Sequence, residues 1–142
     1  MTLEEIEQKR ALRRTQPDTD RKAQETVDLI AIDALEEARG DLLHLMTAAS
    51  FVAGVPVKIA FRAPTAGEYK RYCDLVGRAQ QKSDPIERRK VQEQMALGCM
   101  VYPPADSPAR AAVLDAFPGT LISLSIECAK IAELRAEDEA KS

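Results

Sequence analysis

The chain has 142 residues, of which 45% are apolar and 30% charged, so it suits one folded domain and excludes a second enzyme-sized one. It has no Trp, three Phe and three Tyr, and a core built mainly from aliphatic side chains favours helices. Three widely spaced cysteines indicate a reducing compartment. The charged N-terminus lacks the apolar core of a secretion signal, and no apolar stretch has membrane-spanning length, so we expect a cytoplasmic protein.

The net charge of -3 hides a basic centre. Residues 58–90 carry nine Lys and Arg against four Asp and Glu, whereas residues 1–57 carry seven against eleven and residues 91–142 four against eight. We interpret the basic centre as solvated helix faces that lie near the acidic flanks. A nucleic-acid surface is the alternative, but the acidic flanks and the lack of a helix-turn-helix pattern argue against it. That surface would consist of Lys58, Arg62, Lys70, Arg71, Arg78, Lys82, Arg88, Arg89 and Lys90.

The N-terminal residues are predicted to form a helical arm. Thr2 and Glu5 have the spacing of a capping box, which opens a helix. Pro17 is expected to end this helix, because an interior proline removes a backbone hydrogen bond. The segment is rich in charge and has a narrow apolar stripe, so it should fray when free. We therefore predict an arm at residues 1–17 and a single globular domain at residues 18–142.

A second helix is predicted to begin at Asp18 or Thr19 and to end at Gly40. Its apolar residues recur at steps of three and four, and they form a stripe wide enough to pack against a core or a partner helix. The stripe consists of Val27, Ile30, Ala31, Ala34, Leu35 and Ala38, and the residues expected to stay solvated are Asp28, Asp33, Glu36 and Glu37.

Residues 42–62 are nearly uncharged and rich in apolar and β-branched residues, which predicts a β-hairpin. Residues 42–47 should pair in antiparallel fashion with a strand that follows Pro56, across a loop near residues 48–54. Alternation in the second strand places one row of side chains inward and the other on a solvated face. The inward row is Val57, Ile59 and Phe61, and the solvated row is Lys58, Ala60 and Arg62.

From Pro64 onward the pattern predicts four helices. They are expected to begin at the capping box of Thr65 and Glu68, at Ser83 or Asp84, at Ser107 and at Thr120. The second of these should continue through Tyr102, with Val91, Met95, Gly98 and Cys99 on the same stripe. The last should carry an a/d-like seam of Leu121, Leu124, Cys128, Ile131 and Leu134. The fold class predicted is α+β and mostly α, with one hairpin at about residues 42–62 packed against a helical bundle and an N-terminal helical arm.

No pattern typical of catalysis or metal binding occurs. Cys73, Cys99, Cys128 and His44 are zinc-ligand types, but they lack the closely spaced pairs of zinc sites, and each Cys is expected on the apolar stripe of its helix. No nucleophile and base are grouped, and the glycines do not form a phosphate-binding loop. We therefore expect no enzyme activity, cofactor or metal, and a protein that acts by binding another protein.

Three segments resemble the tail assembly chaperones of tailed bacteriophages of the siphophage type. They are PVKIAFRAPTAGEYKRYCDLVGRA at residues 56–79, ALGCMVYPPAD at 96–106 and Phe-Pro-Gly at 117–119, and the resemblance covers residues 42–134. It implies binding of the long, helical tape-measure protein in the host cytoplasm while the tail tube polymerises, with the tail tube protein as a second candidate partner. It also implies that the chaperone is then displaced and is absent from the mature virion. The helical N-terminus at residues 1–40 is longer than the leader expected in that family.

Arg62, Tyr69, Arg71 and Tyr72 are the predicted partner-binding residues, because Arg and Tyr combine a large contact area with polar tips. Tyr69 and Tyr72 are three residues apart on one helix face, so one of them can belong to the core instead. The rival interpretation is a small cytosolic adaptor or regulator, in which the helix at residues 19–39 forms a dimer seam.

Overall fold

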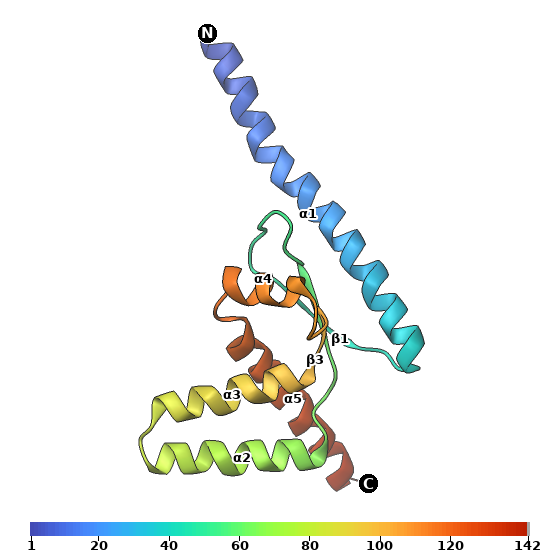
Figure 1. The fold of residues 1–142 in the computed structure, drawn as a ribbon, viewed down its shortest axis with the longest axis vertical. Helices are drawn as coiled ribbons and strands as arrows, with labels where there is room; N and C mark the ends of the chain where they lie inside the picture. Colours follow the sequence, from blue (N-terminus) through green and yellow to red (C-terminus); the bar gives the residue numbers. More distant parts are fainter. Residues whose placement is uncertain (142) are drawn as a thin grey trace.

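The computed structural model describes residues 1–141, which form five helices around a small three-stranded antiparallel sheet (Figure 1). The mostly helical α+β class predicted from the sequence is confirmed. In chain order the elements are α1 (Leu3–Arg39), β1 (His44–Thr47), β2 (Lys58–Phe61), α2 (Ala66–Gln81), α3 (Pro85–Cys99), β3 (Met100–Tyr102), α4 (Pro108–Ala116) and α5 (Thr120–Lys141).

Helix α1 is one long helix rather than two. Its capping box forms as predicted: the Thr2 hydroxyl accepts from the Glu5 N–H, and the Glu5 carboxylate accepts from the Thr2 N–H, both at 3.2 Å. The helix break predicted at Pro17 is wrong, so no second helix begins at Asp18 or Thr19. Because proline lacks an N–H, the continuous helix forfeits one backbone hydrogen bond at this position. The turns on either side continue the helix.

The buried face of α1 differs from the predicted one. Asp28, which was expected to stay solvated, is fully buried together with Ile32, because this side of the helix packs on the sheet. Val27 and Ile30 are exposed instead, at 58% and 67%. Residues 1–20 have exposed side chains throughout, and this half of α1 projects beyond the rest of the molecule (Figure 1). The helix ends at Gly40, as predicted, in the left-handed conformation with a φ of 81°.

The predicted hairpin is confirmed by the antiparallel pairing of β1 with β2, in which His44 lies opposite Phe61 and Thr47 opposite Lys58. The first strand begins later than predicted, since Leu42 precedes it and is 86% exposed. The loop between the strands contains Gly54, whose φ of 78° suits a residue without a Cβ.

The third strand was not predicted. The sequence pattern extended the helix through Tyr102, but α3 ends at Cys99 and the next three residues pair with β2. Val and Tyr favour strands, and the Arg110 guanidinium holds this segment by donating to the carbonyls of Met100 and Pro103, each at 2.8 Å. Pairing across the sheet therefore outweighs the helical periodicity here.

The central strand β2 is covered on both faces. On one face Ile59 and Phe61 join the main core with side chains of α3, α4 and α5, including Cys99, Val113 and Leu124. On the other face Ala60 and Tyr102 pack against Ile32 and Leu43 beneath α1. Ala60 was expected on a solvated face, and it is buried because α1 covers that face. Lys58 and Arg62, from the same row, are half-buried.

Candidate functional site

Arg62 lies at the joint between β2, α2 and α3. Its guanidinium donates to both carboxylate oxygens of Glu68, at 2.7 and 3.0 Å, and to the carbonyl of Gly98 at 2.8 Å. Glu68 also caps α2 by accepting from the Thr65 N–H at 2.9 Å. The hydrogen bond from Arg62 is the main reason why the pKa of Glu68 falls to about 2. Arg62 therefore holds α2 against α3, and both of its terminal guanidinium nitrogens are already engaged within the chain.

Tyr69 points toward α5. Its hydroxyl donates to the Glu133 carboxylate at 3.2 Å, and burial is the main cause that raises the pKa of this tyrosine. The ring stacks on Tyr72, with ring centroids 6.3 Å apart and the planes at 25°. Tyr69 lines a hollow of about 310 Å³ between α2 and α5, with Lys70 and Arg135 at its edge.

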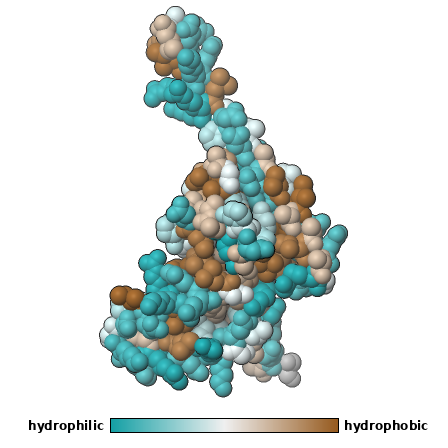
Figure 2. Space-filling view, viewed as in Figure 1, coloured by the Kyte–Doolittle hydropathy of each residue, from teal (hydrophilic) through white to brown (hydrophobic). Residues whose placement is uncertain are grey.

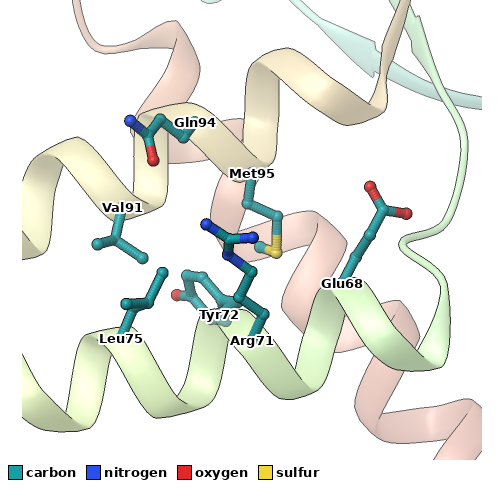
Figure 3. A pocket seen from close by; sticks show the side chains of 7 residues that line it. All are labelled: Glu68, Arg71, Tyr72, Leu75, Val91, Gln94 and Met95. Carbon is teal, nitrogen blue, oxygen red and sulfur yellow. The ribbon is translucent and has the colours of Figure 1, made fainter.

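Tyr72 lies beside Tyr69 and also lines a groove between α2 and α3, together with Arg71 (Figure 3). The apolar floor consists of Tyr72 and Leu75 from α2 and of Val91 and Met95 from α3, and the rim consists of Glu68, Arg71 and Gln94. The groove holds about 180 Å³. Pockets for small molecules usually enclose about 300–1,000 Å³, so this groove suits one or two side chains of a protein partner better than a cofactor.

Local sequence explains why α2 and α3 face each other. The chain turns at Ser83, whose φ is 53°, and the Asp84 carboxylate caps α3 by accepting from the Glu87 N–H at 3.0 Å. Pro85 occupies the first turn of α3, where its missing N–H costs nothing. The two helices then run antiparallel as a hairpin (Figure 1). The predicted caps at Thr65 and Asp84 are thus confirmed, and they position the groove.

The groove borders the basic part of α2. Arg71 is exposed and also lines a neighbouring hollow with Lys70, Asp74 and Arg78. Three of these four side chains are cations, so the local field favours an acidic group beside an apolar anchor. A partner helix that places an acid next to a large apolar residue is complementary to this arrangement.

The structure therefore divides the predicted partner-binding set. Arg71 and Tyr72 lie together at the groove, Tyr69 faces the hollow beside α5, and Arg62 is engaged in the joint. Sequence reasoning missed Leu75 and Gln94 altogether and assigned Val91 and Met95 to the core alone. The useful signal was the Asp-Pro start of α3, because a short helical hairpin brings facing stripes of two helices together.

The cysteines do not behave alike. Cys99 and Cys128 are buried in the core, where a hydrogen bond between their thiols raises the pKa of Cys128 and lowers that of Cys99. Cys73 is exposed, so its predicted place on a buried stripe is wrong. His44 lies beside Phe61, with ring centroids 5.5 Å apart. Within residues 1–141, no three side chains of the His, Cys, Asp and Glu types gather in a way that could hold a metal ion.

Within residues 1–141, no single helix is both long and apolar enough to span a bilayer. Helices α4 and α5 reach that length and composition only as a pair, which is bent by 99°. Comparison with models of protein families, with curated proteins and with solved structures finds no match to the chain.

Proposed function

We propose that this chain is a non-enzymatic tail assembly chaperone, which binds the tape-measure protein of a tailed phage and keeps it soluble during assembly of the tail tube. The observation that carries the proposal is the groove between α2 and α3, with its apolar floor and the basic hollow of α2 beside it. All but the last two residues of α2 lie within the segment at residues 56–79 that resembles the chaperone family, and the last turn of α3 lies in the second such segment.

The groove suits a helix that inserts apolar anchors spaced three or four residues apart. An anchor side chain of the partner would contact Leu75, Val91 and Met95, and Arg71 would pair with an acidic residue one turn away. Covering such anchors prevents the partner helices from associating with one another. A groove for one or two side chains implies a small interface, and a small interface allows release when the tube protein competes.

The experiment is co-expression with the candidate tape-measure protein, which a very long helical coding sequence beside the gene would supply, followed by pull-down. Wild-type protein should keep the partner in the soluble fraction. Arg71→Glu and Leu75→Asp should each weaken binding about tenfold or more, since Arg71 lines the rim of the groove and Leu75 lines its floor. Arg88→Glu makes the same change of charge at an exposed position in the first turn of α3, outside the groove, and should bind like wild type.

Two results would count against the proposal in different ways. If wild-type protein leaves the partner insoluble, the chaperone function is wrong. If Arg71→Glu and Leu75→Asp bind as well as Arg88→Glu, the groove is not the binding surface. Arg62→Glu is unsuitable as a binding variant, because it breaks the joint that positions α2 against α3. A gene neighbourhood of metabolic or stress functions would favour the adaptor interpretation instead.

A further inference from the structure

Helix α1 carries an apolar stripe on the side that faces away from the body. A helix turns about 100° per residue, so Leu12, Ala23, Val27, Ile30 and Ala34 fall within a sector of about 60°, in which Gln16 is the one polar residue between Leu12 and Ala34. The buried Asp28 and Ile32 lie on the opposite side of the helix, and all five members of the stripe are exposed. We call these five residues the outer stripe. Figure 2 shows the projecting end of α1 as mostly hydrophilic, with a few hydrophobic side chains along it.

The projecting half of α1 is not supported by the rest of the described chain. Side chains at residues 1–20 are exposed, and their side-chain hydrogen bonds stay within the helix, as in the 3.0 Å bond from Gln16 to Asp20. Most of the stability of a helix in a protein comes from tertiary packing, which this half of α1 lacks within the described chain. Leu12 is the member of the outer stripe in this half, so a second helix packed along the stripe would cover the projecting half from residue 12 onward.

The charges on α1 favour antiparallel over parallel packing with a second copy of the same helix. Four bases, Lys9, Arg10, Arg13 and Arg14, occupy residues 9–14 without an acid among them, and three acids, Asp33, Glu36 and Glu37, occupy residues 33–37 without a base. Two parallel copies would place bases against bases and acids against acids. Two antiparallel copies that cross near Ala23 bring Lys9 of each copy level with Glu37 of the other, and both residues lie on or next to the outer stripe. Glu36 is half-buried and accepts from the Leu43 N–H within its own chain. The attraction acts between the two helices and does not require fixed ion pairs, and salt weakens it because the charges are exposed.

We propose that α1 pairs in antiparallel fashion with α1 of a second copy of this chain, through the outer stripe, with the crossing at Ala23. In this register Leu12 lies opposite Ala34 of the second copy, and the small side chain of Ala23 lets the two backbones approach closely. The shared segment, residues 12–34, is about 35 Å long. A single helix pair of that length is smaller than a standard interface, so we expect a dimer of roughly micromolar affinity. This inference does not depend on the proposed function.

Disulfide cross-linking tests the register in the full chain, with Cys73→Ser to remove the exposed thiol. Under mild oxidation Ala23→Cys should link two copies, because the crossing places this position against itself. Leu12→Cys should not, because antiparallel pairing separates the two copies of residue 12 by about 33 Å. Equal cross-linking of both variants, or of Leu12→Cys alone, would overturn the antiparallel register.

Sedimentation analysis tests the surface. Ile30→Asp should raise the dissociation constant of the dimer at least about tenfold, since it places a charge in the stripe. Ile86→Asp is the matched control, since Ile86 on α3 is 71% exposed and Ile30 is 67% exposed. Circular dichroism checks that both variants keep their helix content. The proposal would be overturned if the wild-type protein stays monomeric up to about 100 µM, or if both variants weaken the dimer equally. The outer stripe would then be a binding surface for a different protein.

Discussion

Replacing Asp28 by Ala is expected to destabilise the fold strongly, because this buried carboxylate fastens α1 to the sheet. One carboxylate oxygen accepts from the backbone N–H groups of Val57, at 2.7 Å, and Lys58, at 3.0 Å. The other accepts from the Tyr102 hydroxyl at 2.7 Å and from the Gln24 amide at 2.9 Å. Burial and the nearby carboxylate raise the pKa of Tyr102, so its hydroxyl remains a donor at neutral pH.

The magnitude follows from the donors that the substitution leaves behind. Gln24 is only partly buried and can return to water, but two backbone N–H groups and one hydroxyl lose their acceptor. Each unsatisfied buried group costs about 1–3 kcal/mol, and some water entry is expected, so Asp28→Ala should lose about 3–5 kcal/mol. Small domains are stable by only about 5–15 kcal/mol, so the effect is large.

Urea unfolding followed by circular dichroism measures this loss, with Asp33→Ala as the control on an exposed position of the same helix. Tyr102→Phe should cost about 1–2 kcal/mol alone and less in the Asp28→Ala background, where the hydroxyl has already lost its acceptor. A loss below about 1 kcal/mol for Asp28→Ala would refute the reasoning, because it would mean that solvent replaces the carboxylate.

Three further predictions concern the body of the molecule. Leu124→Ala, at a fully buried position, should lower the free energy of unfolding by about 2–4 kcal/mol, and Ile131→Ala, at a half-buried position, should lower it by less. Arg88→Ala should change it by less than about 0.5 kcal/mol. Equal losses for the three variants in urea unfolding would show that α5 is not packed as described. Because the pKa of Glu68 falls from 4.5 to about 2 on folding, its contribution is present above pH 4.5 and is lost as the pH falls toward 2. Glu68→Gln should flatten the stability curve in that range, and an unchanged curve would remove this role. Chelator-washed protein should contain no zinc, and one equivalent per chain in metal analysis would contradict the prediction.

Features that depend on neighbouring residues could be predicted from the sequence. The capping boxes at Thr2 and Thr65, the Asp84 cap and the Gly40 end all form, because each involves residues within one or two turns. The hairpin was predictable too, since the alternation after Pro56 matches its buried row. Local chemistry decides these features, and tertiary contacts do not reverse it.

Features that depend on distant residues could not be predicted in this way. Asp28 is buried because Val57, Lys58 and Tyr102 donate hydrogen bonds to it. The residues next to Asp28 in the sequence do not indicate these distant donors. For a related reason, the predicted partner-binding residues do not all lie at one place. Residues three apart on a helix are rotated by about 60°, which is enough for Tyr69 to face α5 while Tyr72 faces α3. Spacing therefore identifies a shared helix face but not the neighbour that each side chain meets.

The two proposed surfaces have a joint consequence. The projecting end of α1 and the hairpin of α2 and α3 lie at opposite ends of the molecule in Figure 1, so pairing through α1 leaves two grooves open. A long helical partner with repeated anchors could then occupy both grooves, and linked sites can raise overall affinity by a factor of about 10²–10⁴. Ile30→Asp should therefore weaken binding of a long multi-site fragment while leaving a single-site peptide unaffected. If Ile30→Asp weakens binding of both ligands equally, α1 contacts the partner directly. If it weakens binding of neither ligand, each groove acts alone.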